Sequence, residues 1–524
     1  MTSYFTPQFL VLFLPGSVLC YQLVPRRARW AVLLAASYAF FWALSGWLAV
    51  FVTVSALIIW LTGLALGTEA ARRGRELAEP GADRRAVRRL WQRRMRLTLA
   101  AGVLANLGIL VALKYAGFLA GLVRPLGAVT PELPRIGLPI GISFYTMQAV
   151  SYLVDVYRGT VAADANPLRL ALYLTFFPQI MEGPICRYAQ TAQALWSGAP
   201  VTAKQVFSGS ARVLWGLAKR MVVADRLNSL VSPVFADPGS YDGGVIAVAA
   251  VLYTLQLYCD FSGTMDCAVG MGRLFGVALP ENFSQPFFSR TASEFWRRWH
   301  VTLGAWFKDY VFYPVSLSGP VKRLTGSARR ALGGRMGPAA ASGVALFCVW
   351  LANGLWHGAG TQYLLFGMYY FVLIWAGALV EPASQALCAR LGVSRSGALW
   401  HGFQHVRTLL VVVAGELIFR SASAEQGLEL LGRATLGFRA DSLLDGTVLA
   451  VGMDVADFVV VGVFVVLLLV AGVLRERGVH PLEGAWRRGP VARWAVCFAL
   501  LMCVVIFGAY GVGYTPVDPM YASF

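Results

Sequence analysis

Long apolar runs separated by short polar stretches dominate this chain of 524 residues. A run of about 20 apolar residues crosses a bilayer as a helix, so the pattern predicts a polytopic membrane protein of the all-α class. We expect about ten to twelve transmembrane helices. The apolar runs cover Gln8–Val24, Trp30–Leu44, Trp47–Leu66, Leu97–Leu122, Leu138–Tyr157, Val245–Phe261, Ala341–Leu355, Tyr363–Val380, Val406–Phe419, Phe458–Leu474 and Trp494–Tyr510.

Basic stretches between the runs predict the orientation. Glu69–Arg96 carries ten arginines against four acidic residues, and Lys322–Arg335 and Arg475–Arg493 are also basic. Lys and Arg concentrate in cytoplasmic loops, so we place all three there. The first apolar run has arginines after it and none before it, which indicates a retained anchor rather than a cleaved signal. We therefore expect a multi-pass protein of the inner or plasma membrane with its N-terminus outside.

Composition supports the membrane class and excludes others. The chain is 57% hydrophobic and 14% charged, against about 25% charged in soluble domains. The net charge of +18 is typical of cytoplasmic loops and does not predict a nucleic-acid partner. Without an internal repeat, we predict one integral domain. Its parts are peripheral N-terminal spans and a basic loop (1–96), a catalytic core (97–420) and C-terminal spans (421–524).

The segment Leu170–Arg187 is too short and too interrupted for an ordinary span. Pro178, Glu182, Gly183 and Pro184 break its apolar run. Irregular backbone at membrane depth needs protein or water to satisfy its polar groups. We interpret this segment as re-entrant.

A charged segment, Thr291–Pro314, carries the first candidate histidine. Thr291 and Glu294 have the spacing of a capping box, which predicts a helix that begins here and ends at Pro314. The charges predict a helix near the cytoplasmic interface, dipping toward the interior, with His300 one turn before Gly304 on the same face. The charged residues are Glu294, Arg297, Arg298, His300, Lys308 and Asp309, and Trp299 is one of the aromatic residues between them.

The second candidate histidine, His357, ends a strongly apolar run. An imidazole at membrane depth is costly without a partner or a water-filled cavity, which favours a functional role. Asn353 precedes it by one helical turn on the same face. Gly354 and Gly358 are four residues apart and allow another helix to approach closely.

An aspartate, Asp260, interrupts another apolar run between Tyr258 and Phe261. Two interpretations stay open at this point. The carboxylate either holds a neighbouring helix through a hydrogen bond or handles substrate directly.

No metal or nucleotide site is expected. His401 and His405 have the i, i+4 spacing of two metal ligands, but HGFQH lacks the glutamate of HExxH and has no third ligand nearby. The eight cysteines form no CxxC pair and show no paired external spacing. The chain also lacks the GxxxxGK[ST] and GxSxG motifs.

Several segments together resemble the membrane-bound O-acyltransferase family, in particular its bacterial branch that O-acetylates alginate or D-alanylates teichoic acids. The segments are PIGISFYTMQAVSYLVDVYRG from Pro139, FFPQIMEGPICRY from Phe176, QLYCDFSGTMDCAVGMGRLFG from Gln256, ENFSQPFFSRTASEFWRRWHVTLGAWFKDYVFYP from Glu281 and NGLWHGAG from Asn353, with weaker matches in ELIFRSAS from Glu416 and GYTPVDPMYASF from Gly513. The resemblance implies a ring of membrane helices around a central tunnel.

The resemblance also implies roles for both histidines. His357 matches the family's catalytic histidine and His300 its second histidine position. Histidine is suited to take a proton from an acceptor hydroxyl near neutral pH. We therefore expect His357 to act as general base and His300 to orient the donor or stabilise oxyanion charge. The remaining candidates for substrate binding are Asn353, Arg297, Arg298, Lys308, Asp260 and Trp299.

The donor and the acceptor stay open. The donor is acetyl-coenzyme A or an acyl group on a carrier protein, either one a substrate rather than a bound cofactor. The acceptor is an exopolysaccharide, a teichoic acid or an extracytoplasmic acetylation or polysaccharide-biosynthesis protein, and membrane lipid is a further partner. Two other classes compete: a transporter of a polysaccharide or lipid-linked intermediate, and a non-catalytic export scaffold.

Overall fold

The computed structural model describes residues 3–123 and 137–510, and in these ranges all regular secondary structure is helical. The predicted all-α class is thereby confirmed. The weakly matching segment from Gly513 lies outside the described residues. The chain packs as two compact units. This division concerns packing alone, and the single integral domain with its three parts stays a prediction.

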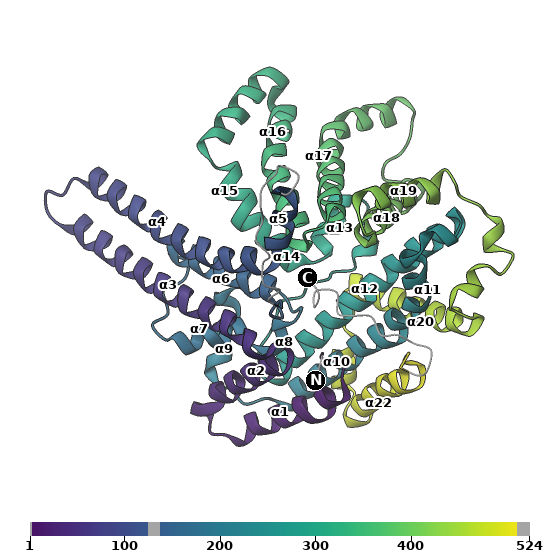
Figure 1. The fold of residues 1–524 in the computed structure, drawn as a ribbon, viewed down its shortest axis with the longest axis horizontal. Helices are drawn as coiled ribbons and strands as arrows, with labels where there is room; N and C mark the ends of the chain where they lie inside the picture. The colour runs from purple at the N-terminus through teal and green to yellow at the C-terminus, as the bar shows by residue number, and fades with distance from the viewer. Residues whose placement is uncertain (1–2, 124–136, 511–524) are drawn as a thin grey trace. The chain divides into compact units, whose positions relative to one another are not determined.

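The first unit contains residues 3–123, 137–213 and Met265–Pro280 of the described chain. Figure 1 shows its helices in purple and blue, with the last turns of α12 in teal. The helices are α1 (Leu14–Leu23), α2 (Arg29–Ser45), α3 (Ala49–Ala78), α4 (Arg84–Leu110), α5 (Ala116–Val123), α6 (Ile142–Arg158), α7 (Pro167–Thr175), α8 (Phe177–Ile180), α9 (Tyr188–Ser197), most of α10 (Ala203–Ala218) and the end of α12 (Gly243–Leu274).

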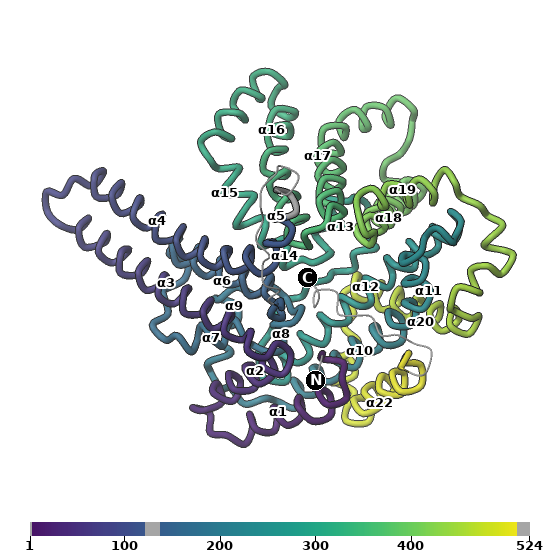
Figure 2. The backbone as a smooth tube through the Cα atoms, viewed as in Figure 1, coloured from purple at the N-terminus to yellow at the C-terminus, as the bar shows by residue number. Residues whose placement is uncertain are grey.

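The most basic stretch is a helical hairpin rather than a loop. Helices α3 and α4 lie side by side along their length and continue through Glu69–Arg96 (Figure 2). Arginine is a good helix former, so a stretch rich in it continues a helix that begins in an apolar run. Gly81, in the left-handed conformation, makes the turn, and the Asp83 side chain caps α4 by accepting from two backbone N–H groups.

The segment predicted to be re-entrant forms two short helices, α7 and α8, that meet at Phe176. Residues 170–186 are all buried. Side chains satisfy the backbone where the helix breaks. Ser37 Oγ accepts from the Phe177 N–H at 3.1 Å, and the Tyr4 hydroxyl donates to the Phe177 carbonyl at 2.5 Å. The helix break therefore belongs to the packed core, where protein side chains supply the hydrogen-bond partners that irregular backbone needs away from water.

The second unit contains Leu214–Thr264 and residues 281–510. It begins with the end of α10 and a π-helical turn, Lys219–Ala224. Its further helices are α11 (Asp225–Ala236), most of α12, α13 (Ala292–Arg298), α14 (Val301–Phe307), α15 (Tyr313–Ser316), α16 (Gly319–His357), α17 (Thr361–Arg390), α18 (Ala398–Arg420), α19 (Ala424–Thr435), α20 (Val455–Glu476), α21 (Pro481–Arg487) and α22 (Pro490–Phe507).

Eight stretches of the described residues are long and apolar enough to cross a membrane, which makes the chain a multi-pass membrane protein. The first of them, Arg26–Ala78, contains both α2 and α3, and the apolar helix Gln8–Leu23 is shorter. Helix α6, which lies in an apolar run that we predicted to span, is not among the eight, and nearly all of its residues are buried in protein. The stretches are Arg26–Ala78, Arg84–Ala120, Gly243–Leu274, Gly319–His357, Thr361–Arg390, Ala398–Arg420, Val455–Glu476 and Pro490–Phe507.

Candidate active site

A left-handed turn places His300. Helix α13 begins as predicted, because Thr291 Oγ1 accepts from the Glu294 N–H at 3.1 Å. It ends at Arg298, however, and His300 adopts φ 48° and ψ 52° before α14 begins. The prediction of one helix from Thr291 to Pro314 is therefore wrong. A left-handed residue redirects the chain, and Pro314 lies in the first turn of α15 instead of ending a helix.

Asn282 holds this turn in place. Its side-chain oxygen lies 3.1 Å from His300 Nδ1, and it accepts from the Thr302 N–H at 3.0 Å and from the Thr302 hydroxyl at 2.9 Å. Its backbone carbonyl accepts from the Val301 N–H at 2.9 Å. One buried asparagine thus connects both sides of the left-handed residue. No spacing rule links this asparagine to a histidine 18 positions later, so sequence patterns do not predict the contact.

The contact with Asn282 selects a tautomer for His300. An amide oxygen only accepts, so the imidazole donates from Nδ1, and Nε2 is the ring's acceptor. The ring is 2% exposed and packs edge-to-face on Phe261 at 4.8 Å. His300 lies outside the eight candidate spans, and burial lowers its pKa to about 3. At neutral pH the group is therefore a neutral imidazole, suited to hydrogen bonding rather than to carrying charge.

His357 is the last residue of α16, and glycines bring α17 against it. A Cβ added at Gly354 would lie 2.5 Å from the Tyr363 carbonyl oxygen, and one at Gly358 would lie 2.4 Å from the Tyr363 ring. The predicted close approach of a second helix is thus confirmed. The imidazole is 5% exposed, and its aromatic neighbours include Phe366 and Phe419.

Trp356 brings the two histidines into one site. Its ring lies 5.8 Å from the ring of His300 and 4.9 Å from that of His357, measured between centroids. Asn353 is also buried, one turn before His357. In the described part of the chain, no hydrogen-bond donor reaches Asn353 Oδ1. This buried oxygen therefore has unused hydrogen-bonding capacity.

Asp260 forms an ion pair with Arg220, which lies on the π-helical turn after α10. Both side chains are 3% exposed. The neighbouring Lys219 donates to Ser262 at 2.8 Å. The ion pair connects α12 to this turn. Asp260 therefore has the structural role, which is one of the two interpretations that the sequence left open. A substrate role for Asp260 stays a prediction.

The other substrate-binding candidates differ in exposure. Arg297 and Lys308 are exposed, and Lys308 lies over the Tyr313 ring. Arg298 is half-buried and pairs with Glu294 and Glu476. Trp299 is buried in an aromatic cluster with Phe283, Phe287 and Phe295. Two basic side chains are thus free to meet an anion in solution, whereas Trp299 packs the core that supports the turn.

No group of three or more His, Cys, Asp or Glu side chains with the geometry of a metal site occurs among the described residues. His405 Nδ1 lies 3.2 Å from the Ser289 carbonyl oxygen, which accounts for that histidine by backbone bonding.

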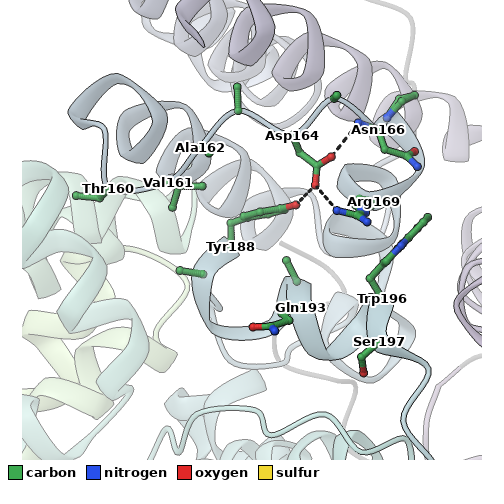
Figure 3. A pocket seen from close by; sticks show the side chains of 15 residues that line it. Thr160, Val161, Ala162, Asp164, Asn166, Arg169, Tyr188, Gln193, Trp196 and Ser197 are labelled. Carbon is green, nitrogen blue, oxygen red and sulfur yellow. Dashed lines mark hydrogen bonds and ion pairs between the residues drawn. The ribbon is translucent and has the colours of Figure 1, made fainter. Parts of the chain in front are cut away.

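A separate open pocket of about 1090 Å³ lies in the first unit, between α7, α9 and the loop before α7 (Figure 3). Asp164 organises one wall by accepting from the Tyr188 hydroxyl and pairing with Arg169 at 3.7 Å. Arg169 in turn lies 4.6 Å over the Trp196 ring. Burial, and after it the hydrogen bond to Asp164, raises the pKa of Tyr188, so that hydroxyl stays protonated. The sequence indicated none of these residues.

Comparison with known proteins identifies the class. Residues 160–327 match the model of the membrane-bound O-acyltransferase family, and this range includes His300. Over 424 residues the chain is 34% identical to the probable alginate O-acetylase of Pseudomonas aeruginosa, covering 80% of this chain and 72% of that protein.

More distant relatives carry other names. The peptidoglycan O-acetyltransferase of Helicobacter pylori is 27% identical over 70% of this chain and 69% of its own length. The teichoic acid D-alanyltransferase of Bacillus subtilis is 28% identical over 45% of this chain and 58% of its own length. The chain belongs to the membrane-bound O-acyltransferase family, and it is an acyltransferase.

Proposed function

We propose that the chain transfers an acetyl group from a cytoplasmic thioester to a hydroxyl of a cell-surface polysaccharide or of an extracytoplasmic relay protein. The observation that carries this proposal is the pair of buried histidines that both contact Trp356. The names of the relatives, two of them O-acetyl transferring enzymes, support acetyl as the acyl group.

In this proposal His357 is the general base. It takes the proton of the acceptor hydroxyl while the oxygen attacks the thioester carbonyl. The carbon–sulfur bond then breaks, and the thiolate leaves and is protonated. His300 is uncharged and is fixed by Asn282. Its ring orients the acyl donor or the carbonyl of the thioester. Asn353 Oδ1 accepts a hydrogen bond from the substrate, because its oxygen is buried with no donor among the described residues.

The membrane arrangement belongs to the same proposal. Ten to twelve spans surround a central tunnel, with α7 and α8 re-entrant, α13–α14 near the cytoplasmic face and the N-terminus outside the inner or plasma membrane. Exposed Arg297 and Lys308 attract the anionic donor, coenzyme A or a carrier protein, from the cytoplasm. Water exclusion around the two histidines protects the thioester from hydrolysis.

The alternative is D-alanyl transfer from a carrier protein to teichoic acid, which the relative from Bacillus subtilis favours. Purified protein in detergent is supplied with labelled acetyl-coenzyme A or labelled D-alanyl carrier protein, together with a soluble polysaccharide acceptor. We expect label transfer from acetyl-coenzyme A that is lost in His357→Ala and His357→Gln, both folded by thermal melt. Transfer from the carrier protein alone supports the alternative. A folded His357→Gln with wild-type turnover contradicts the assignment of the base.

A further inference from the structure

A second cavity of about 500 Å³ lies in the second unit among α16, α17, α18 and the start of α13. One part of its wall is apolar, made by Leu346, Leu373, Ile374 and Val411. The other part is polar and cationic, made by Arg395, Trp400, Arg407 and Thr408, with Glu381 beside Arg395. None of these residues is among the ring contacts of the two histidines described above. The cavity is thus amphipathic, and its lining includes neither histidine nor Trp356.

Three hydrogen-bond donors in this wall have no acceptor among the described residues. They are Arg395 Nη1, Trp400 Nε1 and Thr408 Oγ1, and all three atoms are buried. Thr408 as a whole is 3% exposed. Burying a donor without an acceptor is unfavourable, so three such donors on residues that line one cavity favour an acceptor that enters it. An anionic oxygen cluster such as a phosphate fits donors of this kind.

The charge of the wall favours an anion. Arg395 pairs with Glu381 at 2.8 Å and lies over the Trp400 ring, so its charge is partly balanced. Arg407 donates to the Arg290 carbonyl at 2.8 Å and forms no ion pair among those found in the described chain. The polar end of the cavity therefore keeps a net positive charge.

The apolar end favours a hydrocarbon chain. Helices α17 and α18 are both candidate membrane spans, and they expose Val380, Phe403 and Leu410. Helix α16 breaks at Gly333 (φ 82°) within its basic stretch. Its part after the break and α17 each cross once in the predicted topology, so the turn between α17 and α18 lies at the same predicted face as that basic stretch. Anionic phospholipids are abundant at the cytoplasmic leaflet.

We infer that this cavity binds an anionic phospholipid of the cytoplasmic leaflet. The phosphate accepts from Arg395, Trp400 and Thr408, and one acyl chain begins along Leu373, Ile374 and Val411 and continues into the bilayer. The inference does not depend on the proposed acyl transfer.

Gly377 offers a way to fill the cavity without disturbing the fold. It lines the cavity on α17, and an added Cβ would have no atom within 4 Å. Gly377→Phe therefore occupies the space of the lipid chain. Gly462 on α20 is equally open and does not line the cavity, so Gly462→Phe is the matched control. Thr408→Val removes one donor and keeps the side-chain volume.

The test measures lipid binding by native mass spectrometry. The delipidated full chain is titrated with dioleoyl-phosphatidylglycerol and, in parallel, with dioleoyl-phosphatidylcholine. We expect one phosphatidylglycerol to bind at least about tenfold more tightly than phosphatidylcholine, a difference of about 1.4 kcal/mol. Gly377→Phe abolishes that binding, Thr408→Val weakens it about fivefold or more, and Gly462→Phe leaves it unchanged.

Three results overturn the inference. One is equal binding of the two lipids. Another is binding by Gly377→Phe that matches the wild type. The third is displacement of phosphatidylglycerol by equimolar 4′-phosphopantetheine, which would assign the cavity to the arm of an acyl carrier instead.

Discussion

At the scale of single residues, the site depends on an unusual backbone conformation. In the described chain, only Gln285 and His300 among non-glycine residues have positive φ. Such residues cost about 1–3 kcal/mol each and persist only where their surroundings fix them. Asn282 supplies that constraint through its side chain and its backbone. The strained residue is one of the two histidines assigned to the chemistry, so the cost falls where positioning matters most.

The first prediction concerns Asn282. In Asn282→Ala the Thr302 N–H and hydroxyl and the His300 Nδ1 each lose the same acceptor. We expect the free energy of unfolding to fall by about 1–3 kcal/mol and acyl transfer to fall at least about tenfold. A thermal melt and a turnover assay measure the two effects. Asn282→Asp keeps the accepting oxygen and should restore most of the stability. Equal losses in both variants would argue against the hydrogen-bonding role.

The second prediction concerns pH. Burial holds the pKa of folded His300 at about 3, against an ordinary value of 6.5. Between these values the unfolded chain binds a proton that the folded chain does not, so stability falls as pH is lowered from 6.5 toward 3. His300→Gln lacks this titration. Its melting temperature should therefore decline less than that of the wild type between pH 6.5 and 4.5. Parallel declines would contradict a neutral, buried His300.

At the scale of elements, the contact between α16 and α17 holds His357. Gly354 and Gly367 lie at the crossing, and a Cβ at Gly367 would be 2.4 Å from the Trp350 carbonyl oxygen. The backbones approach so closely that no side chain fits between them. Small residues have this use wherever membrane helices pack at short distance.

The third prediction tests this crossing. Gly354→Ala places a methyl group 2.5 Å from the Tyr363 carbonyl oxygen, so the helices must separate next to His357. We expect a lower melting temperature, equivalent to about 1–3 kcal/mol, and a loss of acyl transfer of about 100-fold or more. Gly326→Ala, in the part of α16 before the break at Gly333 (φ 82°) and with open space around it, is the control and should leave both measurements near wild type. Similar melting temperatures and turnover rates in the two variants would contradict the role of the α16–α17 crossing in positioning His357.

Sequence patterns predicted the elements better than their junctions. The start of α13 followed from Thr291 and Glu294, because a capping box is a local interaction. The break at His300 did not, because it depends on Asn282, which is distant in sequence and has no periodic relation to it. The arginines of α3 and α4 indicated a polar loop, yet their helix propensity continued both helices. Local chemistry is readable from sequence, whereas a turn held by tertiary contacts is not.

At the scale of the whole molecule, the sequence predicted a multi-pass acyltransferase, and both statements are confirmed. Both histidines assigned from the resemblance are buried and touch Trp356, while their catalytic roles stay proposals. The contribution of Trp356 itself was not foreseen, because an aromatic residue in an apolar run looks like ordinary packing. The open pocket of Figure 3 was also missed, since its residues come from two stretches, 160–169 and 188–197, that show no shared spacing pattern.

The fourth prediction concerns orientation across the membrane. A cysteine at exposed Arg88, introduced into a variant whose eight native cysteines are alanine, should resist an impermeant maleimide in intact cells. It should react after the cells are opened. A cysteine at Asp445, an exposed residue two candidate spans before the end of the described chain, should react in intact cells. The reverse pattern would invert the orientation proposed for the chain.

The α3–α4 hairpin also limits how the first unit moves along the membrane normal. At 1.5 Å per residue the 30 residues of α3 measure about 45 Å, beyond the roughly 30 Å of a hydrocarbon core. The excess length is the arginine-rich end. Sliding inward would drag guanidinium groups into hydrocarbon, and sliding outward would leave apolar surface in water. We therefore expect the hairpin to fix the depth of the first unit in the bilayer. The buried break between α7 and α8 then stays at a constant height relative to the lipid headgroups.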